Sequence, residues 1–210
     1  MRPLRRLTVA AAVATGFVYA LAACAPDPAG TGTGLGPPNV IIVREFAISG
    51  GTRVALDPSF GFSLHRGHSG VPARARAASV ARAAAFEVAD AISQRLRAQG
   101  YDALLSGTAA PDPRGKALIV TGVLRYVDEG RRRRVGAEHS SLVADYRVDY
   151  ATPGAAAQPL LVRRVDTRAS AGGIASRAAN INIAARRAGD EIAGTVADLA
   201  RRNNWPVAGR

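Results

Sequence analysis

Three histidines and their neighbours are the side chains best suited to metal binding or nucleophilic catalysis. His65 and His68 stand three residues apart in a segment rich in glycine and serine, without a third metal ligand at a suitable spacing. His139 is followed by Ser140 and Ser141, so a base and two hydroxyl groups are adjacent. The alternative is that His139, Ser140 and Ser141 form a polar cluster at the end of a loop without a catalytic role. These residues therefore give little support to a metal site or a nucleophile.

Two pairs of carboxylates could serve in acid–base chemistry. Asp128 and Glu129 are adjacent, and neighbouring side chains on a strand point to opposite faces. Asp145 and Asp149 share a face, but four residues of strand separate them by about 13 Å, more than a glycosidase pair uses. The glycine-containing segments match neither a dinucleotide-binding loop, a phosphate-binding loop nor a nucleophile elbow. We therefore expect no catalytic residues, no metal and no cofactor.

The densest charge in the chain is a run of four arginines, Arg131, Arg132, Arg133 and Arg134. Guanidinium groups at the tip of a hairpin can bind phosphate through paired N–H donors, which makes this run a candidate anion-binding site. The alternative is a solvated turn that protects a strand edge. The formal net charge of +12 suggests an anionic partner. An arginine-rich composition explains it equally well, because Lys116 is the one lysine.

The single cysteine, Cys24, ends a segment with the features of an export signal. Three arginines precede an apolar stretch, residues 7–23, that is short and rich in alanine for a membrane span. Residues 21–24, Leu-Ala-Ala-Cys, resemble the lipobox of bacterial lipoproteins, in which the signal is cut before the cysteine and the cysteine carries lipid. We expect a signal peptide over residues 1–23 and lipid, including palmitate, on Cys24. An ordinary secretion signal with an incidental cysteine is the alternative.

The expected lipid determines where the protein resides. A diacylglycerol together with an N-acyl chain anchors a protein durably, whereas one acyl chain does not. In lipoproteins with a lipobox, an aspartate directly after the cysteine is the usual signal for retention in the inner membrane. This chain has Ala25 at that position. We therefore expect the periplasmic face of the outer membrane, with the inner membrane as the weaker choice. An exported protein has no nucleic acid partner in ordinary service.

The rest of the chain divides into a tether and one domain. Residues 24–38 are rich in proline and glycine and predict a tether, residues 39–204 form the domain, and residues 205–210 form a tail. Apolar patterns predict strands over 39–48, 101–106, 117–130, 142–150 and 160–169, helices over 74–99 and 180–204, and a long loop over 49–73. The predicted class is α+β, a mixed sheet of about five strands in the order strand, helix, four strands, helix. Both helices should cover one face.

Charges on the last two predicted strands are complementary. We expect these strands to be antiparallel, in the register that brings three opposite-charge pairs together. The pairs are Asp145 with Arg168, Arg147 with Asp166, and Asp149 with Arg164.

Three stretches, VIIVREFAI, the helix end LRAQG and ALIVTGVLRYVDEGRRRRVG, resemble the bacterial lipoprotein family known as domain of unknown function 4410. The resemblance extends from about Asn39 to the final helix and is most recognisable over residues 122–134. The sequence departs from the family just afterwards, where GAEHSS replaces a glycine-rich turn. The family implies no catalytic residues. Its order of elements is similar to that of small α/β domains in envelope assembly lipoproteins, such as the curli secretion lipoprotein and activators of cell-wall synthases.

Together these features predict a non-catalytic, lipid-anchored periplasmic lipoprotein that binds an envelope partner, in protein assembly or cell-wall machinery. The contact would use the face of the sheet without helices, or residues 131–134. The alternative is a module that binds an anionic glycan or lipid through residues 131–134. A hydrolase that uses the histidines is the least supported function.

Overall fold

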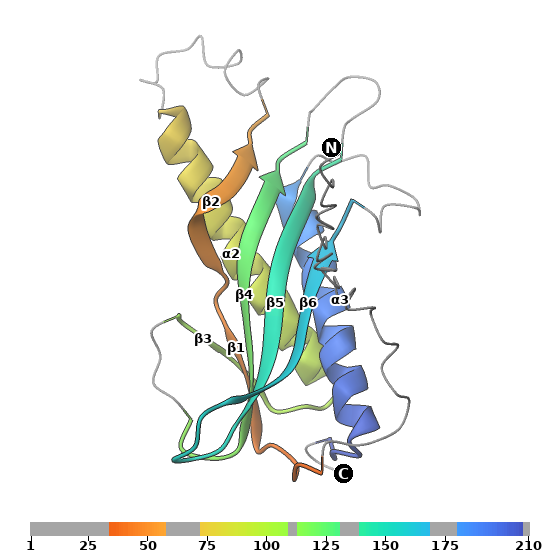
Figure 1. The fold of residues 1–210 in the computed structure, drawn as a ribbon. Helices are drawn as coiled ribbons and strands as arrows, with labels where there is room; N and C mark the ends of the chain where they lie inside the picture. The colour runs from red at the N-terminus through yellow and green to blue at the C-terminus, as the bar shows by residue number, and fades with distance from the viewer. Residues whose placement is uncertain (1–33, 58–71, 109–112, 131–138, 169–179, 208–210) are drawn as a thin grey trace, which may run out of the picture. The chain divides into compact units, whose positions relative to one another are not determined.

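The computed structural model describes residues 34–57, 72–108, 113–130, 139–168 and 180–207 (Figure 1). Their elements are, in chain order, β1 (Val40–Arg44), β2 (Ala47–Ala55), α2 (Ala73–Ala98), β3 (Ala103–Ser106), β4 (Ala117–Asp128), β5 (Ser141–Ala151), β6 (Gln158–Asp166) and α3 (Ile181–Arg202). No helix among these residues is both long enough and apolar enough to cross a membrane.

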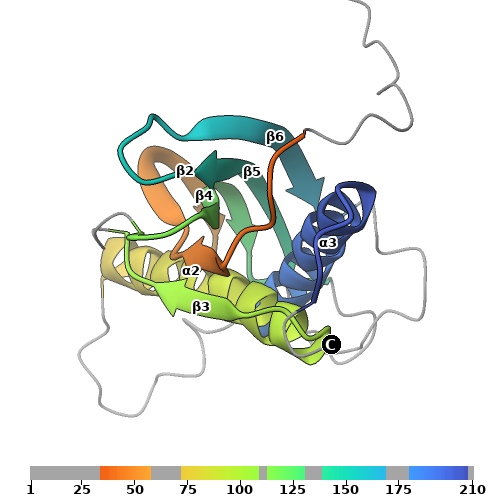
Figure 2. The same cartoon turned by 90° about the horizontal axis from the view of Figure 1, so that it is seen from below.

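The strands form one mixed sheet in the order β3-β1-β4-β5-β6, and β2 pairs with β4 beyond the end of β1. β1, β2 and β3 are parallel to their neighbours, whereas β4, β5 and β6 are joined antiparallel. Both helices pack on the same face of the sheet, as the view from below shows (Figure 2). The predicted α+β class and the placement of the helices are confirmed.

The sequence prediction missed β2, so two strands precede the first helix and the described sheet has six strands. Gly50 and Gly51 gave this segment the composition of a loop. They lie in an irregularity of the pairing with β4, between Ile48 and Arg53. The hydroxyl of Thr52 stabilises it by donating a hydrogen bond to the carbonyl oxygen of Leu124 (2.7 Å).

The predicted register of β5 and β6 is wrong by four residues up to Val148 and by five at Asp149, although the antiparallel pairing is confirmed. Asp145 lies opposite Arg164, and none of the three predicted cross-strand pairs forms. A tight turn explains the difference. The backbone N–H of Ala155 donates to the carbonyl oxygen of Thr152 (3.2 Å), and Gly154 adopts a φ of +75°. This turn lets β6 begin at Gln158 opposite Tyr150, earlier than the charge pattern suggested.

The two helices follow the predicted pattern closely. The predicted stripe of α2 is buried, and so is that of α3 except at its first residue, Ile181, which is only partly buried. The buried stripe residues are Ala81, Ala85, Val88, Ile92 and Leu96 in α2, and Ala185, Ala188, Ile192, Val196 and Leu199 in α3. The side chain of Asn180 caps α3 by accepting a hydrogen bond from the N–H of Asn182 (3.0 Å). Gly100 ends α2 with a φ of +88°, and the N–H of Tyr101 bonds back to the carbonyl oxygen of Leu96 (3.1 Å).

The described chain begins and ends at one end of the sheet, which we call the basal pole: residues 35–39, the start of β4, and the last turns of α2 and α3 with residues 203–207. There the indole Nε1 of Trp205 donates to the carbonyl oxygen of Leu35 (3.0 Å), and the hydroxyl of Tyr150 donates to that of Gly36 (2.8 Å). The Tyr150 and Trp205 rings stack with centroids 5.9 Å apart. The packed domain therefore includes Leu35 and Trp205, just outside the predicted limits of 39 and 204.

Candidate functional site

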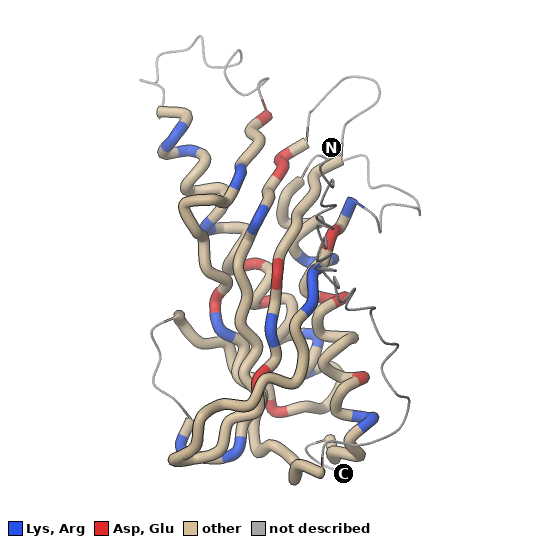
Figure 3. The backbone as a smooth tube through the Cα atoms, viewed as in Figure 1, with Lys and Arg blue, Asp and Glu red and all other residues tan. Residues whose placement is uncertain are grey.

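The face of the sheet opposite the helices is the candidate functional site, and we call it the uncovered face. Alternate residues of β5 point into the core, so the residues between them point to the uncovered face. Figure 3 shows charged positions along this face. Eight charged side chains of this face take part in ion pairs or hydrogen bonds, four arginines and four aspartates: Arg125, Arg147, Arg164, Arg168, Asp128, Asp145, Asp149 and Asp166.

Asp145 is the centre of an ion cluster that crosses three strands. Its carboxylate accepts hydrogen bonds from Nε of Arg164 on β6 (2.6 Å) and from Nε of Arg125 on β4 (2.7 Å). Arg125 is the extra residue of a bulge between Leu124 and Tyr126, which explains how it reaches β5. The hydrogen bond from Arg164 is the largest cause that holds the pKa of Asp145 below its usual value, and burial opposes it.

A second cluster lies toward the end of β4. Arg168 binds Asp166 through Nη2 (2.5 Å), and its guanidinium carbon lies 5.6 Å from the ring centroid of Tyr126. The Tyr126 hydroxyl donates to the carboxylate of Asp128 (3.0 Å). Burial and this hydrogen bond raise the pKa of Tyr126, whereas the hydrogen bond from Arg168 lowers that of Asp166. The pairs hold several side chains of this face in fixed positions.

A further ion pair of this face, between Arg147 and Asp149, lies beside the most exposed large apolar side chain of the described chain. Nε of Arg147 lies 2.8 Å from the carboxylate of Asp149, which is 4% exposed. Opposite Arg147 on β6, Val162 is 70% exposed. The uncovered face thus combines arginines with neutralised charge and an exposed valine on an edge strand.

The residues singled out from the sequence are only partly within the described chain. Cys24, residues 131–134, His65 and His68 lie outside it. His139 is exposed, Ser141 is buried in β5, and the hydroxyl of Ser140 donates to the carbonyl oxygen of Asn180 (2.7 Å). Ser140 therefore links the start of β5 to the N-terminus of α3.

The candidate carboxylates are engaged in structural contacts. Asp128 accepts from Tyr126 and from the backbone N–H of Gly130, whereas Glu129 accepts from the N–H of Asp57 (2.9 Å) and pairs with Arg76 (3.4 Å). Within the described ranges, no group of three or more His, Cys, Asp and Glu residues could hold a metal ion. Arg125 was missed by the sequence analysis, because regular pairing places Val123 opposite Asp145 and only the bulge brings Arg125 to this carboxylate.

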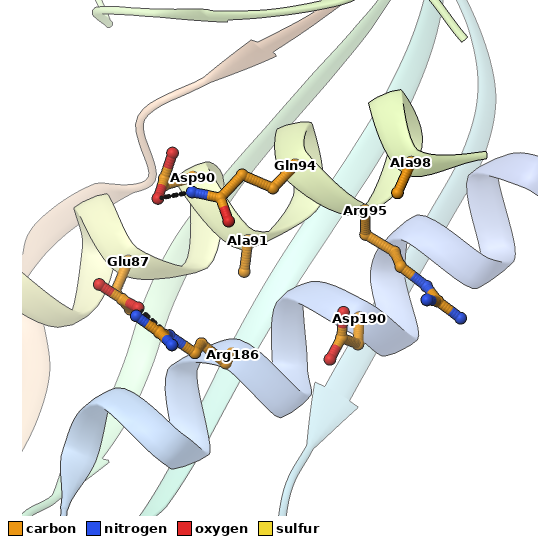
Figure 4. A pocket seen from close by; sticks show the side chains of 8 residues that line it. All are labelled: Glu87, Asp90, Ala91, Gln94, Arg95, Ala98, Arg186 and Asp190. Atoms are coloured by element: carbon orange, nitrogen blue, oxygen red, sulfur yellow. Dashed lines mark hydrogen bonds and ion pairs between the residues drawn. The ribbon is translucent and has the colours of Figure 1, made fainter. Parts of the chain in front are cut away.

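A groove of about 280 Å³ lies on the other side of the molecule, between α2 and α3 (Figure 4). Glu87 and Arg186 form an ion pair across it, and the Gln94 amide donates to Asp90 (2.6 Å). Asp190 and Arg95 also line it. Its ion pair joins the two helices, so we interpret the groove as part of the helix packing.

Comparisons with known proteins give no family for this chain. No protein-family model matches it, and no curated protein does. Among solved structures it is similar to a neuraminyllactose-binding hemagglutinin homologue from Helicobacter pylori, with 11% sequence identity and a TM-score of 0.38. The similarity covers 84% of this chain and 91% of that chain. A likeness at this TM-score carries no argument about function.

Proposed function

We propose that this chain is a non-catalytic lipoprotein of the domain of unknown function 4410 family, anchored through lipid on Cys24 at the periplasmic face of the outer membrane. In this proposal the uncovered face binds a protein of the envelope. The lipobox and the tether support the anchoring. The observation that carries the binding role is the uncovered face itself, with its ordered arginines beside the exposed Val162.

The ion pairs suit this face to protein binding for a thermodynamic reason. A free arginine loses rotamer entropy when a partner immobilises it, and this cost weakens binding. On the uncovered face, carboxylates already restrain Arg125, Arg147 and Arg164. Part of each guanidinium group remains available, since these three side chains are still 49%, 56% and 62% exposed. Arginine is also enriched in protein interfaces relative to lysine.

Replacing Cys24 with serine tests the anchor. The hydroxyl cannot take the thioether-linked lipid, so the variant should move from the membrane fraction to the soluble periplasmic fraction when the full chain is expressed in a bacterial host. The mass of the wild-type N-terminal peptide should show processing at Cys24 with attached acyl chains. A wild-type protein with an unmodified Cys24, or a serine variant that remains fully membrane-bound, would contradict the anchoring.

Replacing Val162 with aspartate tests the binding face. The tagged, acylated protein is used to capture partners from detergent-solubilised envelope, and captured proteins are quantified by mass spectrometry. Loss of one interface anchor should cost about 2 kcal/mol, so the Val162→Asp variant should retain roughly one thirtieth of the affinity for a specific partner. Phe86→Asp is the matched control, because Phe86 is 50% exposed on α2 and the substitution adds the same charge.

The two variants separate the faces of the domain. A partner lost with Val162→Asp and kept with Phe86→Asp supports the proposal. If Phe86→Asp loses the partner while Val162→Asp keeps it, the helical face binds and the proposed site is wrong.

A further inference from the structure

The excess positive charge of the described residues is concentrated at the basal pole. The charged side chains that form the ion clusters of the uncovered face are balanced, with four aspartates and four arginines. At the basal pole, six basic side chains stand against the two acidic side chains Asp102 and Asp198: Arg95, Arg97, Arg114, Lys116, Arg201 and Arg202. Figure 3 shows basic positions at the lower end of the sheet and of α3.

All six of these cations are exposed, and Arg95 lines the groove between α2 and α3. Arg114, Lys116 and Arg202 can contact a ligand directly. Two others are already engaged: Arg201 pairs with Asp198, and Nε of Arg97 donates to the carbonyl oxygen of Ala103 (2.6 Å). Arg114 and Lys116 lie just before β4 and Arg202 lies at the end of α3, on both sides of the segment where the described chain begins.

The basal pole forms one continuous surface around that segment. Lys116 lies beside Gly36, because a Cβ added at Gly36 would be 3.1 Å from Nζ of Lys116. On the other side, Trp205 holds Leu35 by its indole hydrogen bond. A cavity of about 240 Å³ joins the two sides and is lined by residues of the chain start, of β4 and of the segment after α3. The first packed residues are thus fixed between the two groups of cations.

The length of the preceding chain places this surface near the expected lipid. Ten residues, 25–34, separate Cys24 from Leu35. Fully extended, ten residues reach roughly 35 Å, and as a flexible chain they span about 17 Å. Because Leu35 is held at the basal pole, a lipid on Cys24 would keep this pole close to the bilayer.

We propose that the basal pole lies on the bilayer that holds the lipid anchor, and that Arg114, Lys116 and Arg202 bind phosphate groups of its anionic phospholipids. The proposal rests on the proposed anchoring at Cys24. Guanidinium and ammonium groups bind phosphate oxygens strongly, and anionic lipid attracts cations that lie within a Debye length of the surface. The sheet then points away from the bilayer, because the 12 residues of β4 extend about 40 Å from the basal pole.

Trp205 provides a reporter for this contact, because it is the only tryptophan of the chain and lies at the basal pole. The acylated protein is inserted into vesicles that carry a nitroxide spin label on a fraction of the lipid headgroups. Tryptophan emission should be quenched at least about threefold more strongly in vesicles that contain phosphatidylglycerol than in pure phosphatidylcholine vesicles. Raising the salt from ~0.01 M to ~1 M should remove the difference, because the Debye length falls from about 30 Å to 3 Å.

Charge reversal assigns the effect to particular residues. The triple variant Arg114→Glu, Lys116→Glu and Arg202→Glu should show the quenching of neutral vesicles. The matched control reverses three exposed arginines far from the basal pole, Arg53→Glu, Arg74→Glu and Arg82→Glu, and should keep the wild-type quenching. The salt titration of the wild-type protein gives an answer even if the basal variant does not fold.

Two failures can be told apart. If mass spectrometry finds Cys24 unmodified, the proposed anchoring fails. If Cys24 is acylated but quenching is the same in both lipids, or the control variant loses as much as the basal variant, the basal contact is wrong while the anchor stands.

Discussion

Replacing Gly122 with alanine should lower the free energy of unfolding by about 3 kcal/mol, which corresponds to a Tm roughly 6–12 °C lower. Gly122 lies in β4, and the ring of Phe46 rests directly on it. A Cβ added at Gly122 would be 2.1 Å from Cε1 of that ring and 2.6 Å from its Cζ. These distances are far shorter than a van der Waals contact, so the ring or the strand must move.

The ring has little room to move, because Phe46 is 2% exposed and belongs to the central core. It lies where the chain passes from β1 to β2, so its displacement would also disturb the pairing of both strands with β4. Close packing of the interior transmits such a displacement to neighbouring side chains.

Urea denaturation of the purified protein measures the effect. The control is Gly50→Ala in β2, where an added Cβ meets nothing within 4 Å and should change stability by less than about 1 kcal/mol. Combining Gly122→Ala with Phe46→Leu should cost less than the sum of the single variants, because the smaller side chain relieves the collision. Additive costs, or an unchanged Gly122→Ala protein, would show that the ring does not depend on this glycine.

The sequence was sufficient to predict the parts of the fold that depend on local patterns. The apolar stripes of α2 and α3 and the alternation of β5 each reflect a periodic burial that neighbours along the chain reveal. The caps at Gly100 and Asn180 likewise depend on one residue and its own backbone. These features need no knowledge of distant segments.

Other features depend on contacts between distant residues, and there the prediction failed. β2 is held by Thr52 against Leu124, 72 residues away, so its two glycines gave no indication of a strand. The register of β5 and β6 was inferred from charges alone, but Asp145 has arginine neighbours on both adjacent strands. Because several registers bring opposite charges together, the tight turn at Gly154 decides among them.

The candidate sites likewise depend partly on local patterns and partly on contacts between distant residues. The uncovered face follows from two helices that cover one face, which the sequence predicted. Its ion clusters require the bulge at Arg125 and the partner of each arginine, which composition does not reveal. The clamp of Trp205 on Leu35 joins residues 170 apart and defines the basal pole. Lipid on Cys24 and anion binding at residues 131–134 stay predictions, because both lie outside the described chain.

Replacing Gly189 with alanine should destabilise the domain by about 2 kcal/mol, although the same change normally stabilises a helix. Gly189 lies where α3 packs closely against α2. An added Cβ would be 2.6 Å from Cβ of Ala91 and 2.9 Å from the carbonyl oxygen of Val88. Neither atom is the end of a flexible side chain, so the helices themselves must separate along the groove of Figure 4.

Gly194, five residues further along α3, makes the comparison decisive. An added Cβ there meets nothing within 4 Å, so Gly194→Ala should stabilise the domain by about 0.5–1 kcal/mol through helix propensity. The two substitutions change the same chemistry in the same helix and should therefore shift the urea midpoint in opposite directions. Ala91→Gly should rescue Gly189→Ala only in part, since the contact with the Val88 carbonyl remains. If both alanine variants were stabilised, α2 and α3 could not be packed as closely as Gly189 requires.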